Sequence, residues 1–229
     1  MKVKVKICGL TRSRDVRAAV SCGADALGFV FAAGSKREIG PQKAQELVQW
    51  VPAFVARVGL FLDQDAEQVG SILAQVPLSL LQFHGRENAA FCRQFGLPYI
   101  KAVSMNSGHA AAQVVEQAEG EFKDAAALLL DSHDPGGLGG TGRAFHWQRM
   151  GQTGAQAGAR TGRPLILAGG LTPDNVRAAV RLVQPWAVDV SSGVEDAPGI
   201  KNAAAMRRFI EQAKCEYPSE YPGEYPSEQ

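Results

Sequence analysis

Hydrophobic and polar positions along the chain follow two different periods. The segment VKVKI (3–7) alternates apolar and polar residues, which is typical of a strand with one buried face. The segment RDVRAAVSCG (14–23) instead places Val16, Ala19 and Val20 on one side of a helix. The first twenty-three residues therefore predict one strand followed by one helix.

The alternation of one strand with one helix continues along the chain. The further predicted strands cover residues 25–31, 54–62, 78–84, 98–104, 126–132, 163–170 and 186–193. The further predicted helices cover residues 41–51, 65–76, 86–95, about 107–119, about 145–150, 172–183 and about 200–214. Pro41 and Pro173 suit the first helical position, and Thr172 is the expected N-cap of the helix that contains Pro173.

Eight strand–helix units define the predicted architecture. Alternating units favour parallel strands, and eight of them predict a single α/β domain, a (β/α)8 TIM barrel over residues 1–215. An open doubly wound sheet is the alternative. Its best-known signature, G-x-G-x-x-G after the first strand, does not occur in this sequence.

Composition narrows the classes of function. Hydrophobic residues make up 45% of the 229 positions and charged residues 21%, as in a folded protein with a substantial core. The net charge of +1 does not indicate nucleic acid as a partner. No apolar run approaches the roughly 18 residues of a membrane span, and no signal peptide is recognisable. We therefore expect a cytoplasmic protein with no membrane partner.

The last fourteen residues differ from the rest of the chain. EYPSEYPGEYPSEQ (216–229) repeats an E-Y-P-[S/G] unit and carries four glutamates without lysine or arginine. Proline and acidic residues without aliphatic ones predict an extended or disordered tail, with a partner-binding peptide as the alternative. The remaining chain has a net charge of about +5, which suits a small anionic ligand.

The four cysteines are widely spaced along the chain. No C-x-x-C pair occurs, which argues against a zinc ribbon or a redox motif. In a cytosolic protein we expect reduced thiols. Cys22 and Cys92 lie in helical patterns and are expected to fill the core, and Cys215 borders the tail. Cys8 differs from these because it directly follows the first strand.

Polar and small residues gather where several predicted strands end, which is where TIM barrels place their catalytic groups. Strands one, four, six, seven and eight end at Cys8, His84, Asp131, Gly169-Gly170 and Ser191-Ser192-Gly193, respectively. The loops after strands seven and eight of such barrels often bind phosphate through backbone N–H groups. Taken singly, each feature also fits a structural role: a buried thiol, a hydrogen-bonded histidine, a capping aspartate or a glycine turn.

Nine sequence stretches strengthen the functional interpretation when they are considered together. They are KICGLT (6–11), GADALGFVF (23–31), SKREI (35–39), RVGLF (57–61), LQFHG (81–85), LLLDS (128–132), GGTG (139–142), LAGGLTPDNV (167–176) and VDVSSGVEDAPGIK (188–201). In these residues and in their order, the chain resembles the phosphoribosylanthranilate isomerase family of tryptophan biosynthesis. The resemblance covers about residues 2–214.

The resemblance implies a role for each matching residue. Cys8 matches the general base of the family, Asp131 the general acid, and Arg37 the arginine that holds the anthranilate carboxylate. The residues that match the backbone phosphate site are Gly169, Gly170, Ser191, Ser192 and Gly193. GGTG (139–142) matches a mobile loop that helps to close the pocket. Phe83 stands where leucine is more usual. In the loop after the sixth predicted strand, His133 and Asp134 match no assigned role.

The implied reaction is an Amadori rearrangement of a 5-phosphorylated N-glycoside of anthranilate. An acid protonates the ribose ring oxygen as the C1′–O bond breaks, and a base then removes the proton from C2′. Asp131 must therefore be protonated when it acts and Cys8 must be a thiolate, which a nearby positive charge would favour. The route requires neither a metal nor an organic cofactor.

The strand period suggests a source for that positive charge. Side chains alternate between faces, so Cys8 and Lys6 point to the same side of the first strand. Barrel closure places the eighth strand beside the first, and Asp189 shares a face with Ser191. An unpaired lysine inside a barrel would be costly, so we predict a buried Lys6–Asp189 pair. A lysine that extends to solvent at the bottom of the barrel is the alternative.

Other activities compete with this interpretation. Indole-glycerol-phosphate synthase is a related phosphate-binding barrel, but it uses a catalytic lysine and glutamate set. The sugar isomerase of histidine biosynthesis pairs two aspartates, a pattern that Cys8 breaks. A non-catalytic phosphosugar-binding barrel is the third alternative, and retention of both acid and base argues against it. A phosphosugar is the expected ligand, and the sequence does not decide between a monomer and a homodimer.

Overall fold

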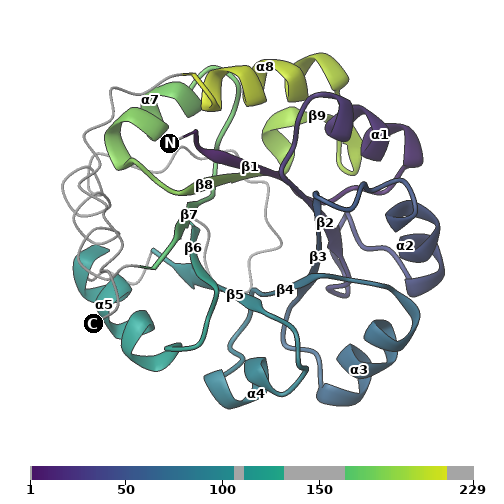
Figure 1. Cartoon of the computed structure of the whole chain (residues 1–229), viewed down its shortest axis with the longest axis vertical. Helices are drawn as coiled ribbons and strands as arrows, with labels where there is room; N and C mark the ends of the chain where they lie inside the picture. The colour runs from purple at the N-terminus through teal and green to yellow at the C-terminus, as the bar shows by residue number, and fades with distance from the viewer. Residues whose placement is uncertain (1, 106–110, 132–162, 216–229) are drawn as a thin grey trace.

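The computed structural model describes residues 2–105, 111–131 and 163–215. Eight parallel strands close into a barrel in chain order, with β1 hydrogen-bonded to both β2 and β8 (Figure 1). The strands are β1 (Lys4–Ile7), β2 (Ala26–Val30), β3 (Ala56–Phe61), β4 (Leu80–Phe83), β5 (Tyr99–Ser104), β6 (Ala127–Asp131), β7 (Leu165–Leu167) and β8 (Ala187–Val190). The predicted (β/α)8 barrel is confirmed, and the open sheet is excluded.

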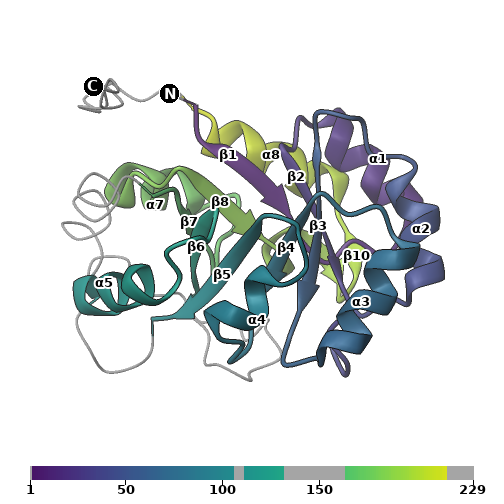
Figure 2. The same ribbon diagram turned by 60° about the horizontal axis from the view of Figure 1, so that its bottom comes forward.

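Helices form the outer ring of the barrel (Figures 1 and 2). They are α1 (Ser13–Ser21), α2 (Pro41–Val48), α3 (Ala66–Gln75), α4 (Ala89–Arg93), α5 (Ala111–Glu121), α7 (Val176–Val183) and α8 (Ala203–Ala213). Asp65 begins α3 with a capping box, in which its side chain and that of Gln68 each accept from the other's backbone N–H. The predicted helix near 145–150, the GGTG loop and the acidic tail lie outside the described residues.

The core has two layers, one on each side of the strands. Inside the barrel, Ile100, Ala102, Leu129 and Ile166 form an apolar cluster. A larger cluster fills the space between the strands and the helices. Phe83 belongs to this outer layer, where its ring packs edge-on against Phe91 at a centroid distance of 5.8 Å. The unusual phenylalanine therefore points away from the barrel interior.

Two local predictions near the end of the chain need correction. Helix α7 begins at Val176 rather than at Pro173, because Asn175 folds the preceding residues into a turn. The Asn175 side chain accepts from the Thr172 backbone N–H and donates to the Gly170 carbonyl, so Thr172 is not the N-cap. A short antiparallel hairpin, β9 (Glu195–Ala197) and β10 (Ile200–Lys201), replaces the start of the predicted last helix.

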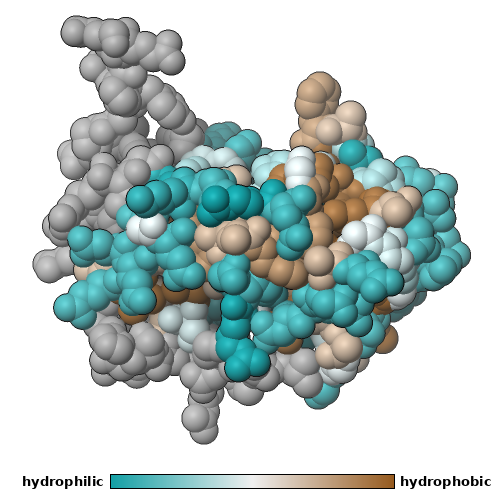
Figure 3. All heavy atoms as spheres, turned by 90° about the horizontal axis from the view of Figure 1, so that it is seen from below, coloured by the Kyte–Doolittle hydropathy of each residue, from teal (hydrophilic) through white to brown (hydrophobic). Residues whose placement is uncertain are grey.

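The surface seen from below the view of Figure 1 is mostly hydrophilic, with hydrophobic side chains gathered over one part of it (Figure 3). Within the described ranges, the large hydrophobic residues that remain exposed are Trp50, Phe54, Leu182, Trp186 and Ile200. Phe54 is fully exposed, and the Arg17 guanidinium lies 4.7 Å from the Trp50 ring centroid. No helix of the described part of the chain is long and apolar enough to span a membrane.

Candidate active site

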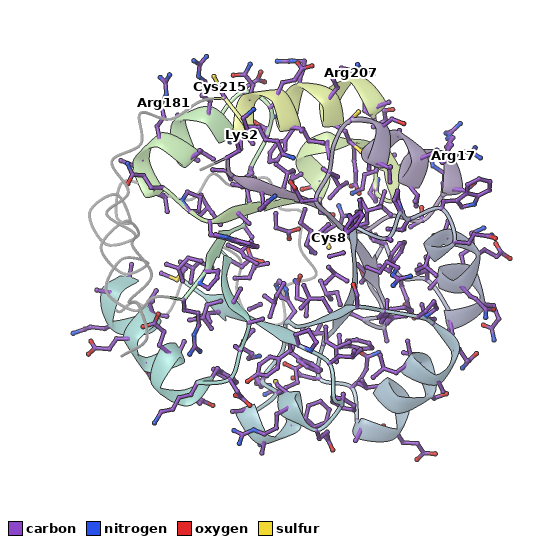
Figure 4. All side chains as sticks on the ribbon, in the orientation of Figure 1. Lys2, Cys8, Arg17, Arg181, Arg207 and Cys215 are labelled. Atoms are coloured by element: carbon purple, nitrogen blue, oxygen red, sulfur yellow. The ribbon has the colours of Figure 1, made fainter. Side chains whose placement is uncertain are left out.

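A pocket of about 140 Å³ opens at the carboxyl ends of the strands and contains every predicted site residue. Those residues are Cys8, Arg37, Asp131, Gly169, Gly170, Ser191, Ser192 and Gly193. Figure 4 shows Cys8 inside the ring of strands, whereas Arg17, Arg181 and Arg207 lie at the outer rim. Residues that are up to 185 positions apart in sequence therefore share one pocket.

The first feature of the pocket is a buried thiol above an ion pair. Lys6 and Asp189 are register partners on β1 and β8, and the Lys6 Nζ donates to Asp189 Oδ1 at 2.9 Å. A Cβ atom on Gly28 would lie 2.7 Å from Cys8 Sγ and 3.1 Å from Lys6 Nζ, which shows that thiol and ammonium face the same point. The predicted Lys6–Asp189 pair is confirmed, and the solvent-exposed lysine is excluded.

The electrostatics of Cys8 reflect two opposing influences. Burial raises the pKa of the Cys8 thiol, and the charge of Lys6 opposes that rise. Burial acts to lower the pKa of Lys6, but the charges and hydrogen bonds of Asp189 and Cys8 together outweigh it, so the pKa of Lys6 is raised. Lys6 is therefore a permanent cation beside the thiol at neutral pH.

The second feature connects Asp131 to β4. The Nε2 of His84 lies 3.0 Å from Asp131 Oδ2, and the Nδ1 of His84 lies 3.0 Å from Gln82 Nε2. Gln82 is completely buried inside the barrel. Sequence reasoning assigned His84 no function, because β4 and β6 are not neighbouring strands and their side chains meet only across the barrel mouth.

The third feature is a pair of loops with free backbone donors. Gly169 and Gly170 have positive φ angles of 87° and 64°, which turn the chain sharply after β7. Within the described part of the chain, the backbone N–H groups of Gly170, Ser192 and Gly193 donate to no protein acceptor. A Cβ on Gly193 would lie 1.8 Å from the Leu171 carbonyl oxygen, so the two loops touch. Unpaired N–H groups on adjoining loops can bind an anion.

The fourth feature is a buried network around Arg37. Arg37 donates from Nε and Nη2 to the two carboxylate oxygens of Glu195, at 2.8 and 2.7 Å. Lys201 Nζ lies 2.6 Å from Glu195 Oε1 and also donates to the Ser191 carbonyl. Burial acts to raise the pKa of Glu195, but hydrogen bonds and charge from Arg37 and Lys201 outweigh this effect. The pKa of Glu195 is therefore lowered. Glu195 is thus a carboxylate that orients Arg37.

Sequence reasoning did not assign roles to Gln82, Glu195 or Lys201. Glu195 and Lys201 lie within VDVSSGVEDAPGIK, but the hairpin that brings them together beside Arg37 had no recognised pattern. The available signal was a pair of opposite charges, Glu195 and Lys201, with the turn residues Pro198 and Gly199 between them. Gln82 was visible as the one strongly polar residue within an otherwise apolar strand LLQF.

These features define a (β/α)8-barrel enzyme with acid and base candidates and a candidate anion-binding loop pair around one pocket. The family model for N-(5′-phosphoribosyl)anthranilate isomerase matches residues 5–212. The N-(5′-phosphoribosyl)anthranilate isomerase of Thiobacillus denitrificans is 50% identical over 214 residues, which are 93% of this chain and 99% of that protein. The enzyme of Pseudomonas aeruginosa is 47% identical over 212 residues, 93% of this chain and 95% of that one.

Solved structures agree with the sequence relatives. The phosphoribosylanthranilate isomerase of Thermotoga maritima superposes with a TM-score of 0.80 at 38% identity, over 93% of this chain and 98% of that one. A phosphoribosylanthranilate isomerase in complex with reduced 1-(o-carboxyphenylamino)-1-deoxyribulose 5-phosphate gives a TM-score of 0.77 at 37% identity over the same shares. The chain belongs to the phosphoribosylanthranilate isomerase family.

Proposed function

We propose that this protein converts N-(5-phosphoribosyl)anthranilate to 1-(2-carboxyphenylamino)-1-deoxyribulose 5-phosphate by an Amadori rearrangement in tryptophan biosynthesis. The observation that carries the proposal is the presence of Cys8 and Asp131 in one pocket with the paired anion-binding loops. Family membership supports the same reaction. The retained acid and base argue against a non-catalytic sugar-binding role.

The reaction begins with proton transfer to the sugar. Asp131 gives its proton to the ribose ring oxygen as the C1′–O bond breaks, which leaves a carboxylate and an iminium. The Cys8 thiolate then takes the proton from C2′, and the resulting enolamine relaxes to the ketone. A thiolate that burial makes more basic is suited to this second step, and the charge of Lys6 opposes the rise in the Cys8 pKa that burial causes.

The two ends of the substrate have separate candidate partners. The phosphate group would accept from the unpaired N–H groups of Gly170, Ser192 and Gly193. Glu195 occupies the Nε–Nη2 edge of Arg37. The anthranilate carboxylate would therefore meet the edge formed by Nη1 and Nη2, which also allows two parallel hydrogen bonds.

The experiment that tests the reaction is a fluorescence assay. Phosphoribosylanthranilate is generated in situ, purified protein is added, and the loss of anthranilate-type fluorescence is followed. Cys8→Ala and Asp131→Ala should each reduce kcat by about 10²- to 10⁴-fold, because each removes one proton-transfer group. Well-folded wild-type protein without turnover would reject the proposed reaction.

The location and assembly of the protein follow as secondary proposals. A biosynthetic enzyme of this kind would work in the cytoplasm. A solved Thermotoga maritima relative is described as a dimeric enzyme from which monomers were generated. Together with the fully exposed Phe54, this favours the homodimer over the monomer. Sedimentation velocity over a range of protein concentrations distinguishes the two.

A further inference from the structure

We propose that Gln82 and His84 are positioning residues for the acid step: Gln82 fixes the tautomer of His84, and the His84 Nε2–H then holds the Asp131 carboxyl group. This inference rests on the proposed function, since Asp131 is the acid of that reaction. It assigns a purpose to a buried glutamine and a pocket histidine that the mechanism above does not use.

The geometry of β4 places the two side chains in one line. Gln82 and His84 are two positions apart on an extended segment, so both side chains point into the barrel. The Gln82 amide lies 3.0 Å from His84 Nδ1, and His84 Nε2 lies 3.0 Å from Asp131 Oδ2. The three side chains therefore form a continuous chain of hydrogen bonds from the barrel interior to the pocket.

The orientation of the Gln82 amide determines the tautomer. The amide nitrogen can only donate, so His84 Nδ1 accepts and the ring proton lies on Nε2. In this orientation Gln82 Oε1 is left without a partner among the described residues. The reversed amide would instead leave both N–H bonds of a buried nitrogen without an acceptor. Orphaned donors are rarer than orphaned acceptors in folded proteins, which favours the orientation observed.

The orphaned oxygen also argues for a function. A buried polar atom without a partner destabilises the fold, and a leucine would fit the apolar strand without this cost. Stability alone therefore does not explain a glutamine at position 82. Its hydrogen bond to His84 does, because among the described residues that is the one side-chain hydrogen bond that a leucine would lose.

The consequence for catalysis concerns the charge on Asp131. As Asp131 gives its proton to the ring oxygen, negative charge develops on its carboxylate, and the hydrogen bond from His84 Nε2 strengthens. The proton on Nε2 remains on His84 throughout, so the acid step still transfers a single proton from Asp131 to the substrate. A His84 with its proton on Nδ1 would instead present a lone pair, and the Asp131 proton would point to His84 rather than to the sugar.

The activity test uses two variants of His84 and one of Gln82. His84→Leu removes the donor and should reduce kcat by about 10- to 100-fold with little change in KM. His84→Gln keeps an amide N–H at about the reach of Nε2 and should recover most of that loss. Gln82→Leu should reduce kcat by about 2- to 10-fold while the resistance to urea stays the same or increases, a split that a purely structural role does not produce.

A spectroscopic test is independent of turnover. Nitrogen NMR of the full chain with ¹⁵N-labelled histidine, at a pH of about 8.5, reports which ring nitrogen carries the proton. The resonances of His84 are assigned by their loss in His84→Gln. We expect the Nε2–H tautomer in wild type and a mixture of tautomers in Gln82→Leu.

The possible outcomes separate this inference from the proposed function. An Nδ1–H tautomer in an active wild-type enzyme, or a His84→Leu variant with kcat within twofold of wild type, would overturn the positioning role alone. Wild-type protein that shows the Nε2–H tautomer but no turnover would reject the proposed reaction and the catalytic part of this inference together.

Discussion

Two buried lysine–carboxylate pairs lie on opposite sides of the barrel wall. Lys6 and Asp189 face the barrel interior beneath Cys8. Lys101 points outward from β5, since its neighbours Ile100 and Ala102 belong to the inner cluster, and it pairs with Glu87 at 3.0 Å. Both pairs are almost completely buried, so burial alone does not explain why the chain keeps them.

The surroundings of the two pairs differ. Glu87 accepts from the backbone N–H groups of Asp63 and Gly85, and Lys101 donates to the Gly85 carbonyl. The outer pair therefore connects the loops after β3 and β4. Among the described residues, the inner pair holds no loop in place and instead places a cation beside a thiol. The same chemical pair thus supports loop structure in one place and, under the proposed mechanism, the reactivity of a thiol in the other.

The largest expected effect comes from replacing the inner pair as a unit. In Lys6→Met/Asp189→Leu, no buried charge is left unpaired, so the free energy of unfolding should stay close to that of wild type. Loss of the Lys6 charge raises the pKa of Cys8 by more than loss of the Asp189 charge lowers it, so kcat at neutral pH should fall by about 10- to 1,000-fold. Turnover and the pH dependence of Cys8 alkylation measure both effects. Unchanged alkylation would contradict the role assigned to Lys6.

The outer pair should show the opposite balance. Lys101→Met leaves the Glu87 charge buried without its cation, which should lower the free energy of unfolding by about 3–5 kcal/mol. The folded fraction should keep kcat within a few-fold of wild type. Urea unfolding and the same fluorescence assay test this, and Lys101→Met/Glu87→Gln should recover part of the stability. A large loss of kcat with unchanged stability would remove the contrast between the pairs.

A substitution at Gly28 tests how tightly the inner pair is packed. A Cβ at this position would lie 2.7 Å from Cys8 Sγ, so Gly28→Ala should displace the thiol. We expect a cost of about 1–3 kcal/mol in stability and a measurable loss of kcat. Gly70→Ala in α3 is the matched control, because its Cβ would meet nothing within 4 Å and should stabilise the helix by roughly 0.5–1 kcal/mol. Equal behaviour of the two variants would contradict tight packing at Cys8.

The smallest effect concerns the partly exposed pair between Lys4, on the same strand as Lys6, and Asp25, which precedes β2. Burial acts to raise the pKa of Asp25, but hydrogen bonds from Lys214, the Val5 N–H and Lys4 lower it below its usual value. A carboxylate with a lowered pKa contributes stability above its unfolded pKa of about 4, and this contribution is lost as the pH falls below it. Asp25→Asn should therefore cost less than about 1 kcal/mol at pH 7, and the cost should decrease as the pH falls to about 2. Thermal unfolding of Asp25→Asn and wild type at the two pH values measures this cost. Lys4→Met at pH 7 is the control, because it removes one partner of Asp25 and leaves the carboxylate in place.

The fold and part of the site were predictable from local patterns. The alternation of side chains between the two faces of β1, together with the closure of an eight-unit barrel, was sufficient to place Lys6 beside Asp189. The contact between His84 and Asp131 was not predictable in this way, because β4 and β6 are separated by β5. Such a contact depends on strand tilt, which leaves no pattern in the sequence.

The network around Arg37 was unpredictable for a different reason. Glu195 reaches Arg37, and Lys201 reaches Glu195, only because a short hairpin with strands of three and two residues folds back after β8. Segments this short carry too few residues for a period to be recognised. The start of α7 was misjudged at Thr172 because a side-chain turn by Asn175 takes precedence over the usual preference for proline at a first helical position.

The contact between Gly193 and the Leu171 carbonyl has a consequence for engineering. The loops after β7 and β8 adjoin so closely that a side chain cannot be added at position 193 without moving the other loop. A designer who wishes to change the anionic group that this barrel accepts should therefore exchange both loops as one cassette, together with Asn175, which anchors the first of them. The strands and loops of the first six units could then be inherited unaltered.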